Sequence, residues 1–177
     1  LVMYALWYRY IKKDPAESVR LLLGSTSGLA LLLLGESYRD GIGVYINREE
    51  SSKYLRMAAD KGSAHATFLM GQLMLRLTSQ QEAESLIQQA AKWGDTDAQA
   101  CLGMIYLESD NTSTVKKFEA VKWLEMSASK KNATGQLELA KCYERGIPEF
   151  NFQKARELYA SSAELGNESA KAALTMY

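Results

Sequence analysis

Two short serine motifs are the residues of this chain whose types and spacing most directly suggest catalysis. Ser113 and Ser127 each stand three residues before a lysine, the Ser-x-x-Lys spacing with which β-lactamase-like hydrolases present a nucleophilic serine. Ser109-Asp110-Asn111 spells the second motif of those enzymes, but it precedes both serines, and the chain has no Lys-Thr-Gly. The chain also shows little of the period-two alternation that predicts strands. A cell-wall-directed hydrolase is therefore an alternative interpretation, not the favoured one.

Other candidate catalytic groups are sparse. His65 is the one histidine of the sequence, so we expect neither a multi-histidine metal site nor a Ser-His-Asp triad. It stands between two alanines at a predicted helix start, where surface capping is favoured over catalysis. No glycine-rich phosphate loop follows a predicted strand. We therefore predict that the protein is not an enzyme and has no catalytic residue, no cofactor and no metal.

Cys101 and Cys142 are predicted to be free thiols. They fall on neighbouring predicted helices but four positions out of phase. With helix axes about 10 Å apart and a rise of about 1.5 Å per residue, their separation exceeds the reach of a disulfide. Free thiols fit a reducing compartment and leave the periplasm open. Sequons at Asn111, Asn132 and Asn167 lie in predicted turns, which favour Asn anyway; the alternative is a glycosylated eukaryotic lumenal protein.

Composition and charge indicate a folded, helical and neutral chain. Hydrophobic residues make up 47% of the 177 and charged residues 24%, an ordinary globular balance. Lys plus Arg and Asp plus Glu both number 21, so no net field attracts nucleic acid or an anionic membrane. Two prolines occur, and good helix formers dominate. The apolar run 29–34 is far shorter than the roughly 20 residues of a membrane span, so we expect none.

The elements that carry these residues are predicted to be helix pairs, because the sequence repeats itself. A pair of small residues followed by a Gly three positions later recurs along the chain. Its copies lie at 58–62, 90–94 and 162–166, with a weaker copy at 127–131. The second small residues, at positions 59, 91, 128 and 163, are 32, 37 and 35 residues apart. This spacing is typical of solenoids built from helix pairs.

A second signature recurs once in each repeat and indicates a closely packed helix face. Its copies are Leu34-Gly35 with Tyr38, Met70-Gly71 with Met74, Leu102-Gly103 with Tyr106, and Leu139-Ala140 with Tyr143. The apolar residues at i and i+4 share one face, and the small residue lets a neighbouring backbone approach. We predict first helices at 30–38, 66–75, 98–107 and 136–143, and second helices at 49–59, 81–91, 118–128 and 152–163. A degenerate pair is expected at 1–11 and 16–23.

Glycines stand just past predicted helix ends, where a left-handed residue closes the turn without a steric penalty. They are at positions 41, 62, 94, 146 and 166. Lys131 occupies the corresponding position of the third repeat. We expect Asn132 to take the left-handed conformation in that turn, since Asn tolerates it better than other non-glycine residues.

The stretch 34–44, followed by 54–59 and Gly62, resembles a complete Sel1-like repeat, a relative of the tetratricopeptide group. The shared pattern is Leu-Gly, Tyr, a Gly-x-Gly-Val loop, and a second helix that ends Ala-Ala before Gly. The loop is intact only in this repeat and survives in the fourth as Gly146-Ile147-Pro148. The resemblance implies an all-α, right-handed α-α superhelix of about four to five repeats. We expect a single domain, 1–177, with a degenerate repeat at 1–28, repeats at 29–64, 65–97, 98–133 and 134–169, and a capping or truncated repeat from 170–177.

The resemblance implies a scaffold or adaptor. Bacterial members of the family are often exported or linked to host interaction and signalling, and the favoured location is the bacterial cytoplasm, or the periplasm or export from the cell. Stacked pairs should leave a concave wall of first helices for a protein or peptide partner. The predicted wall residues avoid the packing face. They are Glu36, Arg39, Asp40, Gln72, Leu75, Arg76, Met104, Leu107, Glu108, Lys141, Glu144 and Arg145. We expect a monomer; the remaining alternative is a structural spacer within a longer protein.

Overall fold

The computed structural model describes residues 1–77, 80–108 and 114–176, with the side chains of residues 76 and 77 excepted. Within these ranges the chain forms eleven helices and no strand. It divides into two compact units, Leu1–Gln89 and Ala90–Tyr177. Among the described helices, none has the length and apolar character needed to cross a membrane. The all-α fold predicted from the sequence is confirmed.

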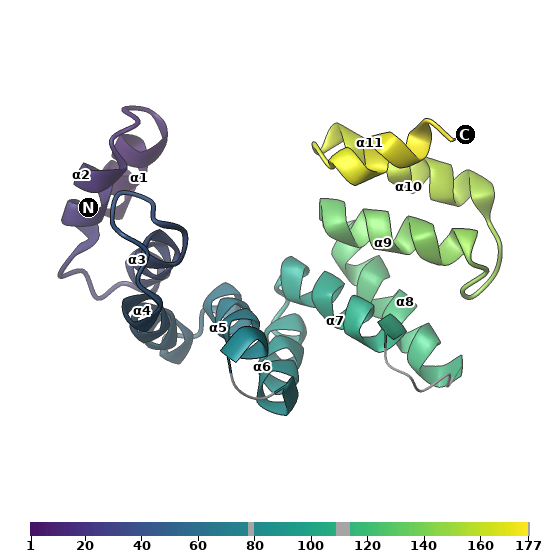
Figure 1. The fold of residues 1–177 in the computed structure, drawn as a ribbon, viewed down its shortest axis with the longest axis horizontal. Helices are drawn as coiled ribbons and strands as arrows, with labels where there is room; N and C mark the ends of the chain where they lie inside the picture. Colours follow the sequence, from purple (N-terminus) through teal and green to yellow (C-terminus); the bar gives the residue numbers. More distant parts are fainter. Residues whose placement is uncertain (78–79, 109–113, 177) are drawn as a thin grey trace. The chain divides into compact units, whose positions relative to one another are not determined.

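The first unit consists of helix pairs in which each helix packs on the next one along the chain (Figure 1). Its helices are α1 (Val2–Tyr10), α2 (Pro15–Leu22), α3 (Gly28–Asp40), α4 (Arg48–Asp60) and α5 (Ala64–Leu77), followed by most of α6 (Gln80–Lys92). Helix α3 also contacts α5, so the first helices of two neighbouring repeats lie beside each other. Leu34 and Leu55, both fully buried, form part of the core of this unit.

The second unit repeats this arrangement. It contains the end of α6 and the helices α7 (Thr96–Glu108), α8 (Thr114–Ser129), α9 (Ala133–Glu144), α10 (Phe152–Glu164) and α11 (Glu168–Leu174). Helix α7 packs on α8, α9 on α10, and the first helices α7 and α9 contact each other. Buried side chains of α8, α9, α10 and α11 form one continuous hydrophobic cluster. Every predicted helix is present, with ends that differ from the prediction by at most four residues.

Most of the described helices begin at side chains that accept hydrogen bonds from the first-turn backbone, as N-cap preferences predict, whereas α1 has no side-chain cap. Asp14 caps α2, which starts with Pro15 at a position where no N–H is needed. Asn132 accepts a hydrogen bond from the Gly135 N–H at the start of α9, and Asn167 caps α11 in the same way. Two of the three sequon asparagines therefore serve as helix caps. The third, Asn111, lies outside the described residues.

The predicted close-packed face is confirmed by the glycines that lie on it. A Cβ atom added to Gly35 would lie 2.6 Å from the side chain of Leu55 on the partner helix. A Cβ atom added to Gly71 would lie 2.8 Å from Cγ1 of Ile87, which places α6 directly against α5. Real Cβ contacts are longer than this, because packed carbon atoms approach to about 3.5–4.0 Å. The glycines therefore set how closely the two helices of a repeat approach.

The turn after α8 differs from the sequence prediction. Lys131 itself adopts a left-handed conformation, with φ +60°, like Gly62, Gly94 and Gly166 at the equivalent turns. Asn132 has φ −78° instead, so the prediction that it would be left-handed is wrong. The reason is that Asn132 is the N-cap residue of α9, and an N-cap residue has a non-helical backbone with a negative φ.

Replacing Lys131 with Gly is expected to raise the free energy of unfolding by about 1 kcal/mol. A non-glycine residue in the left-handed region costs about 1–2 kcal/mol, and glycine removes this steric cost while losing more backbone entropy on folding. Urea denaturation followed by circular dichroism measures the change. The control is Lys131→Ala, which removes the same side chain but keeps a Cβ atom at the positive φ. An equal gain in both variants would contradict the explanation.

Candidate partner-binding site

The serine motifs do not assemble a nucleophile in the described part of the chain. Ser127 is fully buried, and its hydroxyl donates a 2.8 Å hydrogen bond to the carbonyl oxygen of Thr96. The ammonium of Lys130 donates to the carbonyl oxygen of Gly94 at 3.1 Å. Both groups are therefore engaged by backbone carbonyls at the ends of helices. Ser113, in the other motif, lies outside the described residues.

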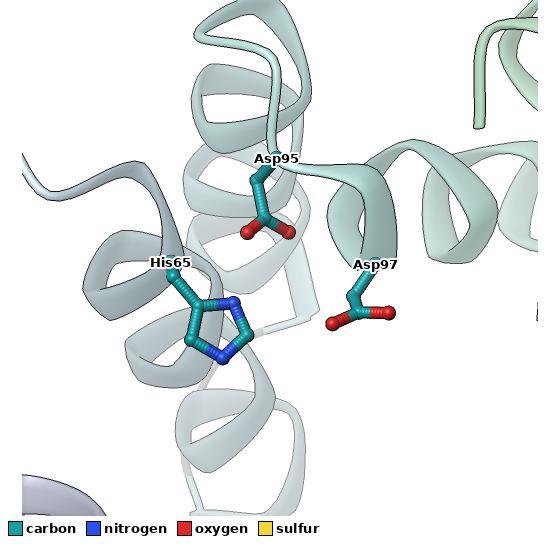
Figure 2. Close-up of side chains that lie close together, drawn as sticks. All are labelled: His65, Asp95 and Asp97. Carbon is teal, nitrogen blue, oxygen red and sulfur yellow. The ribbon is translucent and has the colours of Figure 1, made fainter. Parts of the chain in front are cut away.

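His65 and the two aspartates drawn with it in Figure 2 stand at helix starts, and each has a local structural role. Ser63, not His65, caps α5 by accepting from the Ala66 N–H. Asp95 accepts a 2.7 Å hydrogen bond from the Ala98 N–H at the start of α7. Asp97, two residues further along the chain, accepts a 2.6 Å hydrogen bond from the side-chain amide of Asn132. The aspartates thus hold the start of α7 and tie it to the start of α9.

Both cysteines are free thiols, as predicted. Cys142 is 1% exposed, and burial raises the pKa of its thiol to about 11. Burial also raises the pKa of Cys101, which is half-buried on α7. A buried thiol with a raised pKa holds its proton and is a poor nucleophile. The fold therefore uses both cysteines as packing residues.

In the native protein at about pH 8, iodoacetamide is expected to label Cys101 before Cys142, because the thiolate is the reactive form and Cys142 is inaccessible. The rates are measured by mass spectrometry of peptides after timed labelling, and in urea they should become equal. Equal rates in the native protein would contradict the burial of Cys142.

The raised pKa of Cys142 also predicts how stability depends on pH. The pKa is about 11 in the folded protein and 9.0 ordinarily, so the thiol ionises at a lower pH in the unfolded chain. The contribution of this thiol to the free energy of unfolding is therefore lost as the pH rises from 9 towards 11.

Glu36 joins three first helices of the first unit. Its carboxylate lies 3.8 Å from the Arg9 guanidinium of α1 and 3.8 Å from Nε2 of His65 on α5. The Arg9 side chain is 5% exposed and also donates a hydrogen bond to the Ser37 hydroxyl. A buried arginine needs such partners, because an unpaired charge away from water is costly. Glu36 therefore stabilises the stack, and its side chain is 24% exposed.

Three of the predicted wall residues lie together in a pocket of about 350 Å³ in the first unit. The pocket is lined by the end of α3, the connection to α4, the start of α4, and the exposed side of α5. The lining residues are Arg39, Asp40, Ile46, Arg48, Leu69, Gln72 and Leu73. Leu75 lies further along α5 and is 44% exposed. The side chain of Arg76 lies outside the described residues.

Arg39 and Asp40 bind each other at the mouth of this pocket. The Arg39 guanidinium donates two hydrogen bonds of 2.7 Å, one to each carboxylate oxygen of Asp40. The bidentate contact lowers the pKa of Asp40 and raises that of Arg39. Both groups therefore stay charged near neutral pH and cancel each other's charge. The pair supplies polar edges to the pocket but no net charge.

The predicted wall residues of the second unit fall into two groups. Lys141 forms a 2.7 Å ion pair with Glu138, Glu144 accepts a 2.6 Å hydrogen bond from the hydroxyl of Tyr159, and Leu107 packs against the hydrophobic cluster. These three support the fold. Glu108 and Arg145 are exposed and Met104 is half-buried, so these three remain available to a partner.

Sequence reasoning missed the residues that complete the pocket. Ile46 lies in the connection between α3 and α4, and Arg48 is the first residue of α4, whereas the predicted wall was confined to first helices. One signal was available in the sequence, because Tyr45 and Ile46 are two consecutive apolar residues between predicted helices. In the structure their side chains are 96% and 65% exposed. Arg9 was also missed, because its partners lie 27 and 28 residues away along the chain.

Three segments, 28–63, 96–132 and 133–167, match the family model described as the Sel1 repeat, and together they make up more than half of the chain. The chain belongs to the Sel1 repeat family. The crystal structure of a Sel1 repeat protein from Oxalobacter formigenes superimposes with a TM-score of 0.80 at 30% identity, covering 96% of this chain and 73% of that one. Sel1 repeat proteins generally mediate protein–protein interaction.

Two curated relatives of this chain are much longer than the chain itself. The rat protein named DAP3-binding cell death enhancer 1 is 37% identical over 92 residues, which are 51% of this chain and 18% of that protein. The protein NMB1327 of Neisseria meningitidis serogroup B is 31% identical over 174 residues, which are 95% of this chain and 37% of that protein. The chain therefore spans a minor part of either relative.

Proposed function

We propose that this chain is a scaffold or adaptor that binds a protein or peptide partner along the exposed sides of its first helices. The observation that carries the proposal is the pocket between α3 and α5, where Arg39, Asp40 and Gln72 line one cavity. Protein–protein interfaces place polar groups around an apolar centre. In this pocket Leu69 and Leu73 supply the apolar centre.

The relatives support the same interpretation. The Sel1 repeat family works through protein–protein contacts, and the name of the rat relative states that it binds another protein. The predicted surface in this chain includes the exposed residues Gln72 on α5, Glu108 at the end of α7 and Arg145 just after the end of α9. We propose that it acts by binding and not by catalysis, since Ser127 and Lys130 are engaged by backbone carbonyls.

The proposal is tested by photo-crosslinking in cells. A benzophenone side chain placed at Gln72, exposed on α5, or at Arg145, exposed just after the end of α9, is expected to capture a partner. The matched controls are Lys122 on α8 and Glu157 on α10, exposed positions on second helices, which are expected to capture none. Circular dichroism verifies that all four variants fold.

The outcome separates the proposal from its alternatives. Capture of the same protein from Gln72 and Arg145, but not from the second-helix positions, supports binding along the first helices. Equal capture from all four positions would place the interface elsewhere. No capture from any position would favour the structural spacer.

A further inference from the structure

The pocket between α3 and α5 has an apolar base of a size that suits one or two side chains. Leu69 lines it although this residue is only 3% exposed, so it lies at the base, with Leu73 beside it. Ile46 is 65% exposed and forms part of the rim. The volume of about 350 Å³ is at the lower end of the range for ligand pockets, about 300–1,000 Å³.

The charge at the mouth of the pocket is positive. Arg39 and Asp40 neutralise each other through their paired hydrogen bonds. Arg48 is exposed, and within the part of the chain that the structure describes its guanidinium has no ion-pair partner. Glu49 and Glu50 follow in the first turn of α4 but do not line the pocket, and Glu50 is bound by Lys53 at 3.3 Å. Among the residues that line the pocket, the charge of Arg48 is therefore the uncompensated one.

Arg48 is held at an ordered helix start. It is the first residue of α4, whose first turn also contains Glu49 and Glu50. Asn47 accepts hydrogen bonds from the N–H groups of Glu49 and Glu50, which orders the backbone at this point. The guanidinium therefore extends from an ordered helix start rather than from an irregular loop.

We infer that this pocket binds a partner segment in which a bulky apolar side chain adjoins a carboxylate. The apolar side chain packs against Leu69, Leu73 and Ile46, and the carboxylate accepts hydrogen bonds from Arg48. A single net positive charge matches a carboxylate better than a phosphate dianion, which clusters of arginines recognise. The inference rests on the proposed function, because it names the chemistry of the partner at one part of the proposed surface.

The test begins with selection of random dodecapeptides displayed on phage against the immobilised 177-residue chain. Enriched peptides are expected to carry Asp or Glu beside a bulky apolar residue. One such peptide is then labelled, and its affinity is compared with that of its Asn or Gln counterpart by fluorescence polarisation. The acidic peptide is expected to bind about tenfold more tightly, because the amide cannot form a charge-assisted pair with arginine.

Arg48→Gln is expected to abolish this preference, so that the acidic and amide peptides bind the variant equally. The matched control is Arg56→Gln, an exposed arginine on the same helix that does not line the pocket, and it should keep the full preference. Ile46→Ala should lower the affinity for both peptides by the same factor, because it removes an apolar contact and no charge. Circular dichroism shows whether each variant is folded.

Several outcomes would overturn the inference. These are enriched peptides without an acidic residue, no enriched peptide, a preference that survives Arg48→Gln, or displacement of the acidic peptide by inorganic phosphate. The proposed function is judged separately by the crosslinking experiment. If Gln72 and Arg145 capture a partner while Arg48→Gln changes nothing, the scaffold function stands and the carboxylate pocket does not.

Discussion

Replacing Gly103 with Leu is expected to lower the free energy of unfolding by about 3 kcal/mol, the upper end of the usual cost of overpacking. A Cβ atom at this position would already lie 2.7 Å from Cγ of Leu124 and 3.1 Å from the carbonyl oxygen of Ala120. Leucine adds three further carbons in the same space. Helices α7 and α8 would have to move apart, and contacts along their whole length would weaken. Urea denaturation followed by circular dichroism measures the loss.

Two further variants identify the cause of that loss. Gly71→Leu should be similarly destabilising, because Ile87 lies as close on the partner helix. The control is Gly28→Ala at the start of α3, where the added Cβ has one neighbour at 3.6 Å, an ordinary contact. Its effect should stay below about 1 kcal/mol, within the range of helix propensity. A neutral result for Gly103→Leu would show that the Leu-Gly face is not the packing face.

Replacing Tyr159 with Ala is expected to be the most damaging single truncation, with a loss of about 3–5 kcal/mol in the free energy of unfolding. Tyr159 is 2% exposed and lies in the hydrophobic cluster of the second unit. Its hydroxyl donates a 2.6 Å hydrogen bond to the Glu144 carboxylate. The alanine variant loses the ring contacts, leaves a cavity and removes this hydrogen bond.

Tyr159→Phe separates the ring from the hydroxyl. It keeps the packing and is expected to cost about 1.5–3 kcal/mol, the range for a hydrogen bond to a charged group. Phe152→Ala on the same helix is the control, since Phe152 is 57% exposed and should cost less than about 1 kcal/mol. Chemical denaturation of the three variants measures the free energy of unfolding that each one loses. If the phenylalanine and alanine variants lost equal stability, ring packing would not be the main contribution.

The proposed partner surface and the stability of the fold depend on different residues. Glu144 illustrates the distinction: it was predicted to face a partner, but its carboxylate holds the hydroxyl of a core tyrosine. Gln72 and Arg48 illustrate the opposite case, because both are exposed residues that line the pocket. Variants at these two positions should therefore change binding without large changes in stability, which makes them suitable for functional tests.

The sequence alone determined the helix pairs, their order and the face on which they pack. These features are local: the i, i+4 spacing of Leu34 and Tyr38 defines a helix face, and a Gly between them permits close approach. The capping residues and the glycines at helix ends are also local signals, because their hydrogen bonds and φ angles involve neighbours within a few residues. The local prediction failed for the turn at Lys131, where Asn132 had two competing roles, and for His65, because Ser63 caps α5 instead.

The tertiary structure decided which exposed residues lie together. Arg39 and Gln72 share a pocket because α3 packs beside α5, and the α3–α4 connection brings Ile46 and Arg48 to the same place. The spacing of residues within one helix does not specify the rotation of that helix against its neighbour or the path of a connecting segment. Those depend on the summed packing of many side chains. Repetition in the sequence therefore predicts the scaffold, whereas the chemistry of its binding surface arises from contacts between repeats.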